Sequence, residues 1–145
     1  MAFAEAGAPI FSSCLRRRYF SIVLDAGGRV LSTGFNETAP GQVHCGDGGC
    51  PRALLSQEEL QSGSYYGLAC TSLHSEINAL MYSDRSLREG GTLVVSGFPC
   101  QDCAKVIAGS GVARLVYRFD PSYVGAEETV SYLQRVGLEL IDVGN

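Results

Sequence analysis

The sequence has little positive charge, no long hydrophobic run and no basic leader. Its 145 residues contain 11 lysines and arginines against 15 aspartates and glutamates, giving a formal net charge of −4 at pH 7. The basic tract Arg16-Arg17-Arg18 is too small for the basic face of a nucleic-acid-binding protein. No apolar stretch is long enough to cross a bilayer, and residues 1–13 lack the basic start of a signal peptide. We therefore expect a cytoplasmic protein that acts on a small molecule, without nucleic acid or a membrane as a partner.

Two short stretches contain the residue types that bind zinc. They are His74-Ser75-Glu76 and, later in the chain, Pro99-Cys100-Gln101-Asp102-Cys103. Zinc takes imidazole nitrogen and thiolate sulfur in a tetrahedral shell, and a catalytic zinc keeps three protein ligands and one open position for water. His74, Cys100 and Cys103 would be these ligands, and Glu76 would be the catalytic group that moves protons. The combination of H-x-E and P-C-x-x-C is the signature of zinc deaminases that act on nucleobases.

The spacing of apolar residues predicts that both stretches start helices. Residues 73–84 carry apolar side chains at helical spacing, namely Leu73, Ile77, Leu80 and Met81. His74 and Glu76 are then expected in the first turn. Pro99 suits the start of a second helix, where the dipole favours two thiolates one turn apart. A C-x-x-C pair alone would also suit a redox motif or a purely structural metal site, so the prediction of a zinc hydrolase depends on both motifs together.

Strand and helix patterns alternate along the chain. Residues 19–24 and 29–33 are expected to form a hairpin, with a turn at residues 25–28. Further strands are expected at residues 92–96, 114–117 and 138–143, and helices at residues 73–84, 99–109 and 125–135. Residues 1–12 suit a short helix or an arm. Right-handed crossovers would make the C-terminal strands parallel. We therefore predict an α/β fold with a mixed five-stranded sheet and helices on both faces, in a single domain over residues 1–145.

Four cysteines remain outside the zinc motifs, and they are Cys14, Cys45, Cys50 and Cys70. Two of them lie in a glycine-rich segment, residues 38–67, where the only expected element is a short helix at residues 56–61 capped by Ser56. Four thiolates make one tetrahedral zinc shell, with His44 as an alternative ligand. A second, structural zinc would order this long segment. Ordinary buried thiols are the alternative, and disulfides are not expected because nothing indicates export.

From Cys14 to its end, the chain resembles the deoxycytidylate (dCMP) deaminase family of the cytidine deaminase superfamily. Beside the two zinc motifs, the matching segments are Gly-Arg-Val-Leu-Ser-Thr-Gly-Phe-Asn at residues 28–36, His44-Cys45, Gly-Cys-Pro-Arg at residues 49–52, and Gly-Val-Ala-Arg-Leu-Val-Tyr at residues 111–117. The resemblance implies a three-layer α/β/α cytidine-deaminase-like fold and a homo-oligomer.

The resemblance also implies the reaction, which is hydrolysis of dCMP to dUMP with release of ammonia. Activated water would attack C4 of the cytosine ring, and Glu76 would carry protons to the ring nitrogen and the leaving amine. The substrate-binding residues that it implies are Asn36 at the nucleoside, Ser96 and Gly97 at the base edge, Tyr117 beside the ring, and Arg85 with the Arg16 to Arg18 run at the phosphate.

Three departures from the family pattern concern the substrate. Tyr19-Phe20-Ser21 stands where the family usually has Val-Gly-Ala, so we expect larger side chains beside the pocket. Glu37 stands where a glycine usually follows the asparagine, and its charge would repel a phosphate or a regulatory triphosphate. Ser75 replaces the usual alanine and should not disturb zinc binding. These changes leave open the deamination of an unphosphorylated nucleoside, a free base such as a purine, or a specialised metabolite.

Two other functions fit the sequence less well. Deamination of bases within a nucleic acid would require an aromatic and basic surface pattern, which this acidic chain lacks. A catalytically silent, zinc-stabilised binding module would have no use for the carboxylate of Glu76.

Overall fold

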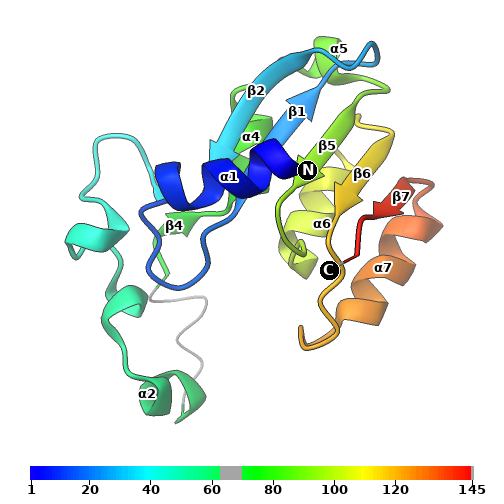
Figure 1. Cartoon of the computed structure of the whole chain (residues 1–145). Coiled ribbons are helices and arrows are strands. Elements are labelled where there is room, and N and C mark those ends of the chain that lie inside the picture. The colour runs from blue at the N-terminus through cyan, green and yellow to red at the C-terminus, as the bar shows by residue number, and fades with distance from the viewer. Residues whose placement is uncertain (63–69, 145) are drawn as a thin grey trace.

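A mixed five-stranded sheet forms the centre of the structure, a computed structural model that describes residues 1–62 and 70–144 (Figure 1). Its strands are β1 (Phe20–Leu24), β2 (Val30–Phe35), β5 (Thr92–Val95), β6 (Arg114–Tyr117) and β7 (Glu139–Asp142), in the order β2-β1-β5-β6-β7. β1 is antiparallel to β2 and β5, whereas β5, β6 and β7 are parallel to one another. The predicted sheet, its hairpin and its parallel C-terminal strands are confirmed.

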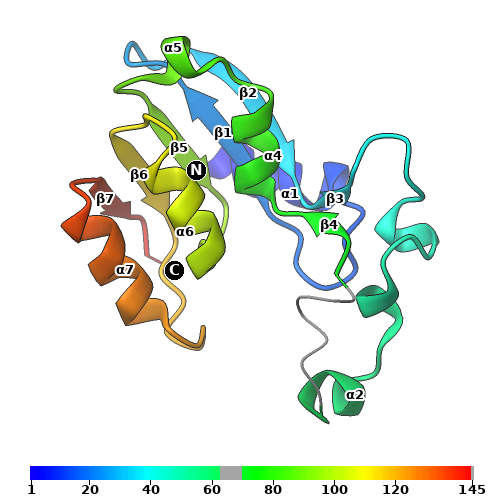
Figure 2. The same cartoon turned by 180° about the vertical axis from the view of Figure 1, so that it is seen from behind.

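Helices cover both faces of this sheet. α4 (Ser75–Met81), α6 (Gln101–Ala108) and α7 (Ala126–Arg135) lie on the face that Figure 2 turns toward the viewer. α1 (Ala2–Phe11) crosses the opposite face and contacts β1 (Figure 1). The three-layer α/β/α prediction is confirmed, and residues 1–12 form a helix rather than an arm. No helix in the described ranges is both long enough and apolar enough to span a bilayer.

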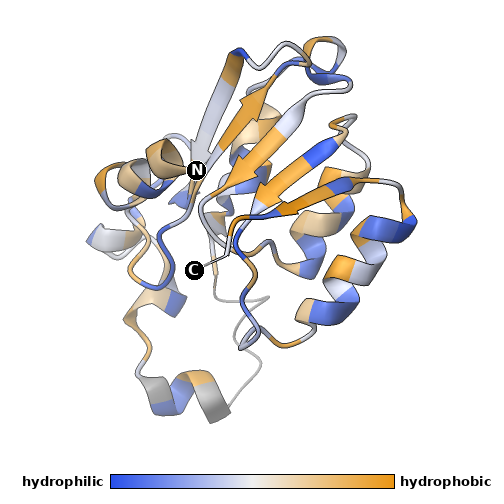
Figure 3. Ribbon diagram, turned by 45° about the vertical axis from the view of Figure 1, so that its right-hand side comes forward, coloured by the Kyte–Doolittle hydropathy of each residue, from blue (hydrophilic) through white to orange (hydrophobic). Residues whose placement is uncertain are grey.

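The core has two parts because successive strand residues point to opposite faces of the sheet. On β1, Phe20 and Ile22 pack with Ala4 and Ala8 of α1. Val23, which follows Ile22 and points to the other face, belongs to the larger cluster under α4, α6 and α7. Figure 3 shows hydrophobic residues concentrated in the central strands. The sheet therefore supports α4 and α6, the two helices at whose starts the zinc motifs lie.

Between β2 and α4 the chain leaves the main sheet and forms a lobe, residues 37–62 and 70–73, which we call the cysteine lobe (Figures 1 and 2). Its elements are β3 (Glu37–Thr38), η1 (Cys45–Asp47), η2 (Pro51–Leu54), α2 (Gln57–Ser62) and β4 (Ser72–Leu73). β3 and β4 pair antiparallel and close the lobe at its base. Ser56 caps α2 as predicted, since its Oγ accepts the Glu59 N–H at 3.2 Å. Residues 63–67, the end of the segment expected to be irregular, lie outside the described residues.

The first motif helix differs from its predicted bounds at both ends. His74 is the N-cap of α4, with extended backbone, rather than a residue of its first turn. α4 ends at Met81 instead of residue 84, because Asp84 takes extended backbone and caps a further short helix, α5 (Arg85–Arg88). The Asp84 carboxylate accepts the N–H of Ser86 at 2.7 Å.

Candidate active site

The three predicted zinc ligands lie together where α4 and α6 begin. His74 is the N-cap of α4, Cys100 is the N-cap of α6, and Cys103 lies in the first turn of α6. His74 Nδ1 lies 3.4 Å from Cys100 Sγ and 3.3 Å from Cys103 Sγ. Among the histidines, cysteines and acidic residues of the described ranges, only these bring three ligand atoms within 4.8 Å of one another.

These distances and donor types fit zinc. Two ligands of a tetrahedral zinc at ordinary Zn–N and Zn–S lengths are about 3.5 Å apart. One imidazole and two thiols supply three donors and leave the fourth position of such a shell for water. Zinc is therefore the cofactor, and His74, Cys100 and Cys103 are positioned to hold it.

The electrostatics of Cys100 favour a bound cation. A hydrogen bond with the Cys103 side chain, with further help from His74, lowers the pKa of Cys100 to about 4. The backbone N–H of Cys103 also donates to Cys100 Sγ at 3.4 Å, as expected at the start of a helix. The pKa of Cys103 is raised because it shares a hydrogen bond with Cys100 and is buried. Cys100 is thus held as the thiolate, the form in which cysteine binds zinc.

Glu76 is buried beside this cluster and still lines a cavity. Only 2% of the residue is exposed, and burial raises the pKa of its carboxyl group. The hydroxyl of Ser75 donates to Glu76 Oε2 at 3.0 Å. A carboxyl group in this position can exchange protons with a molecule in the cavity while bulk water is kept away.

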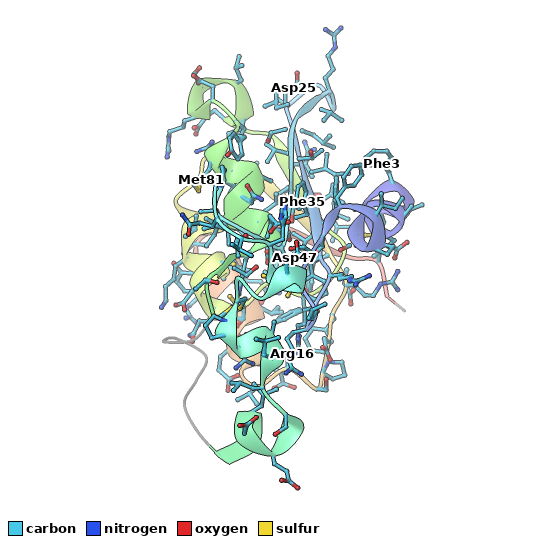
Figure 4. The ribbon with its side chains drawn as sticks, turned by 90° about the vertical axis from the view of Figure 1, so that its left-hand side faces the viewer. Phe3, Arg16, Asp25, Phe35, Asp47 and Met81 are labelled. Carbon is cyan, nitrogen blue, oxygen red and sulfur yellow. The ribbon has the colours of Figure 1, made fainter. Side chains whose placement is uncertain are left out.

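The cavity has a volume of about 150 Å³ and lies between the zinc cluster and the base of the cysteine lobe. Its lining residues at the zinc cluster are His74, Glu76, Cys100 and Phe98. On the other sides it is lined by Arg16, Arg17, Tyr19, Asn36, Arg52 and Tyr123, together with three cysteines of the second group. Figure 4 shows Arg16 near the lobe, far from Asp25 at the turn between β1 and β2. One cavity therefore joins the zinc ligands and an acid–base group to guanidinium groups.

The arginines of this cavity are held by backbone and aromatic groups. Arg16 donates to the carbonyl oxygens of Arg52 and Leu55, which ties the segment before β1 to the lobe. The guanidinium of Arg17 lies 5.4 Å from the centre of the Tyr123 ring and donates to the Tyr19 hydroxyl at 3.3 Å. The third residue of the run, Arg18, is exposed and donates to the Cys14 carbonyl rather than lining the cavity.

Asn36 lines the cavity, as its predicted contact with the nucleoside requires, and it also has a structural role. Its Nδ2 donates to the Arg17 carbonyl at 2.9 Å, and its Oδ1 accepts the N–H of Ser75 at 2.9 Å. The side chain therefore connects the arginine segment to the first turn of α4. Its contact with a nucleoside stays a prediction.

Four further predicted substrate contacts do not line the cavity. Ser96 uses its Oγ to accept the N–H of Phe20 at 2.9 Å, between strands β1 and β5. Tyr117 is buried and packs edge-on against Phe98, with ring centres 5.8 Å apart, and Phe98 is the ring that lines the cavity. Arg85 lies on α5, exposed, where it donates to the Gly109 carbonyl at 2.6 Å. Gly97 instead makes room for Tyr19, because a Cβ there would lie 2.4 Å from the Tyr19 ring.

The expectation of enlarged side chains beside the pocket is wrong for Phe20 and Ser21, neither of which lines the cavity. Tyr19 lines the cavity, but Phe20 points to the opposite face and packs against α1. Glu37 lies outside this cavity too. It accepts hydrogen bonds from Ser13 and Thr38 and pairs with His44 at 3.0 Å, next to a second cavity of about 420 Å³. Its carboxylate is therefore not a wall of the zinc-containing cavity.

The second group of cysteines is gathered in part. Cys45, Cys50 and Cys70 pack together, and the Cys50 thiol interacts with those of both Cys45 and Cys70. Burial raises the pKa of Cys45 to about 11. Cys14 lines the active-site cavity with Cys50 and Cys70. Within the described residues these thiols form a looser set than the His74 cluster, and His44 pairs with Glu37, so the second zinc stays a prediction.

Sequence reasoning missed five residues that line the cavity, Phe98, Tyr123, Arg52, Ala53 and Ser72. Phe98 directly precedes the Pro99-Cys100 motif, and this position could have identified it. Arg52 lies in the segment of residues 49–52 that resembles the deaminase family, and this resemblance could have indicated that Arg52 is near the active site. Tyr123 comes from the loop between β6 and α7, where no periodic pattern indicates which way a side chain points.

Comparison with known proteins agrees with this geometry. The chain matches the family described as "Cytidine and deoxycytidylate deaminase zinc-binding region" over residues 11–119. It is 35% identical over 133 residues to a deoxycytidylate deaminase of Schizosaccharomyces pombe, with 89% of this chain aligned to 38% of that protein. It is 37% identical over 107 residues to the deoxycytidylate deaminase of Mycobacterium phage D29, with 73% of this chain aligned to 81% of that protein.

The fold is similar to that of a solved phage enzyme. The dCMP deaminase of the cyanophage S-TIM5, crystallised with dCMP and dUMP, has a TM-score of 0.71 and 29% identity, covering 98% of this chain and 92% of that one. The family match includes all three residues of the zinc cluster and Glu76. The chain therefore belongs to the cytidine and deoxycytidylate deaminase zinc-binding family.

Proposed function

We propose that this chain is a zinc-dependent hydrolytic deaminase that converts dCMP to dUMP and ammonia. The observation that carries the proposal is the composition of one cavity. It holds His74, Cys100 and Glu76 for the chemistry at the base, and Arg16, Arg17 and Arg52 as cationic groups for a phosphate. The relatives named deoxycytidylate deaminase and the S-TIM5 enzyme, crystallised with dCMP and dUMP, support the same substrate.

The proposed chemistry replaces an amino group by oxygen at C4 of cytosine. When bound, zinc supplies a Lewis acid that makes water a nucleophile near neutral pH. The carboxylate of Glu76 accepts the two protons of that water in turn and delivers one to N3 of the ring and the other to the amino group. The C4–O bond forms, the C4–N bond breaks, and ammonia leaves. His74, Cys100 and Cys103 would hold the metal throughout, and burial of Glu76 shields its carboxyl group from bulk water.

The other lining residues orient the nucleotide. Arginine binds phosphate oxygens through paired N–H groups in a planar fork, so Arg17 and Arg52 suit the 5′-phosphate. The rings of Phe98 and Tyr123 supply flat apolar walls for a base or sugar. Asn36 contacts the nucleoside from the end of β2. Phe20 and Glu37, which indicated an unphosphorylated substrate, lie outside this cavity.

The ammonia released by purified, zinc-loaded protein tests the substrate. We would compare dCMP, deoxycytidine, cytosine, guanine and adenosine in parallel at equal concentration. Preference for dCMP over deoxycytidine is expected, because only dCMP carries the phosphate. Turnover of an unphosphorylated compound with none of dCMP would overturn the proposed substrate and leave the deaminase chemistry in place.

The proposal extends to four further features. A structural zinc is held by Cys14, Cys45, Cys50 and Cys70, all of which are free thiols. The chain acts as a single domain over residues 1–145, in the cytoplasm, and assembles as a homo-oligomer. Elemental analysis tests the second zinc, with two zinc ions expected per chain of the wild type and one in Cys45→Ser. Equal zinc content in both proteins would remove Cys45 from the ligands.

A further inference from the structure

Two fully buried serines lie behind Glu76. Ser21 comes from β1 and Ser75 from the first turn of α4, and both are 0% exposed. Their hydroxyl oxygens are 2.8 Å apart, and Ser75 Oγ lies 3.0 Å from Glu76 Oε2. A continuous line of hydrogen bonds therefore runs from the central sheet to the carboxyl group in the cavity.

When Glu76 is ionised, the hydrogen-bonding chemistry of the two hydroxyls and the carboxylate fixes which group donates to which. A carboxylate only accepts hydrogen bonds, so the Ser75 hydroxyl donates its single hydrogen to Glu76. Ser75 must then accept the hydrogen of Ser21. The order of donation is Ser21 to Ser75 to Glu76, and the hydrogen bond from Ser21 strengthens that from Ser75 by polarising its hydroxyl.

The backbone around both serines is rigid. Ser21 is paired with Gly34 of β2 on one side and with Val95 of β5 on the other. The N–H of Ser75 donates to Asn36 Oδ1 at 2.9 Å. α4 also lies directly on β2 at Gly34, where a Cβ would come within 2.2 Å of the Ala79 nitrogen. Neither serine can therefore follow Glu76 if the carboxyl group moves, and both can hold it in place.

Burial of both hydroxyls indicates a function. A buried hydroxyl loses its hydrogen bonds to water, whereas an alanine of nearly the same size would pack in the sheet–helix interface without that loss. Two buried hydroxyls are found at this interface, and both belong to one line of hydrogen bonds that ends at the proposed catalytic group. A role of this line in orienting Glu76 explains why serines are present there. Ser21 is fully buried, so the line positions Glu76 and is not a path for protons to solvent.

We propose that Ser21 and Ser75 are positioning residues that hold the Glu76 carboxyl group in the orientation needed for proton transfer in the cavity. Ser75 acts on Glu76 directly, and Ser21 acts through Ser75. The kinetic part of this inference rests on the proposed deaminase function. Its structural part, the orientation of the Glu76 carboxyl group, does not.

A double-mutant cycle tests the chain of contacts. We expect Ser75→Ala to lower kcat by about tenfold, because small displacements of a catalytic group are costly, while KM for dCMP and zinc content stay unchanged. Ser21→Ala should lower kcat less. The double variant should equal Ser75→Ala, since Ser21 has no other route to Glu76. Ser32→Ala is the matched control, because Ser32 Oγ donates to the Ala79 carbonyl at 2.7 Å on the same helix without contacting Glu76.

Crystal structures of the zinc-loaded variants supply a readout that does not depend on turnover. We expect one Glu76 rotamer in the wild type and in Ser32→Ala. In Ser75→Ala we expect the Glu76 carboxyl group to be shifted or to occupy two conformations. An unchanged Glu76 orientation in both Ser75→Ala and Ser21→Ala would overturn the inference, as would an equal loss of kcat in Ser32→Ala. If Ser75→Ala does not fold, kcat and the Glu76 orientation of Ser21→Ala test the inference instead. A wild type inactive on dCMP would contradict the proposed function, and the crystal structures would still decide the positioning role.

Discussion

The sheet with its helices and the cysteine lobe hold their functional side chains by different means. His74, Cys100 and Cys103 sit at the starts of helices that pack on a five-stranded sheet, and His74 Nδ1 lies within 3.4 Å of both sulfur atoms. The cysteine lobe has short elements and a looser set of thiols, with a small cluster around Cys45 as its core. A preformed site needs a rigid scaffold, whereas the proposed second zinc would supply most of the order of the lobe.

The largest effect should come from Glu76→Gln, which removes the proton carrier and leaves the zinc ligands intact. We expect turnover of dCMP to fall by about 10² to 10⁴-fold, the usual contribution of a general acid and base. Zinc content should equal that of the wild type. Glu89→Gln, which changes an exposed carboxylate on the surface, is the control. Wild-type activity in Glu76→Gln would remove the proposed mechanism, and loss of zinc would indicate a structural role instead.

A glycine pair compares the packing of the two regions directly. Gly34→Ala should destabilise the chain by about 3 kcal/mol, because its Cβ would meet the backbone of α4 and push the helix off the sheet. Gly46→Ala in the cysteine lobe should change stability little, since the nearest atom to its Cβ would be the Ser13 carbonyl oxygen at 3.6 Å. Thermal unfolding of both variants, with wild type, measures the difference. Equal destabilisation would mean that the lobe is packed as tightly as the sheet.

Sequence patterns predicted the rigid region well because its information is local. The helical spacing of apolar residues in 73–84 and the helix start expected at Pro99-Cys100 placed both zinc motifs at helix starts. The alternation of side chains along a strand could also have shown that Phe20 faces away from Tyr19 and Ser21. The misplacement of Arg85 had another cause. An expected helix through residue 84 left no room for α5, and its start depends on the cap at Asp84.

The walls of the cavity could not be predicted in the same way. Phe98 rather than Tyr117 lines it, because the two rings pack edge-on and Phe98 lies between Tyr117 and the cavity. Arg52 and Tyr123 come from segments without periodic patterns, and the tertiary fold alone brings them to Glu76. Metal chemistry is encoded in short motifs, whereas substrate contacts come from long-range packing.

Arg17→Gln tests the cationic side of the cavity, where the segment before β1 meets the lobe. We expect KM for dCMP to rise about 20-fold with kcat nearly unchanged, because the phosphate is held equally in the ground and transition states. KM for deoxycytidine, if it is a substrate, should not change. Arg85→Gln is the matched control, since Arg85 lies on α5 away from the cavity. The same rise for both substrates would indicate that Arg17 supports the cavity wall through Tyr123 and does not bind phosphate.

The smallest effect is expected from Ser56→Ala, which tests whether the cysteine lobe unfolds separately from the sheet. Ser56 and Glu59 exchange hydrogen bonds at the start of α2, with Ser56 N–H donating to the Glu59 carboxylate at 2.7 Å. Loss of such a cap costs about 1 kcal/mol. Amide exchange in α2 should therefore accelerate about fivefold while the melting temperature of the sheet is unchanged. Glu58→Gln, on the same turn, is the control. A matching fall in the melting temperature would show that lobe and sheet unfold together, and that the lobe is ordered by its contacts with the sheet as much as by its cysteines.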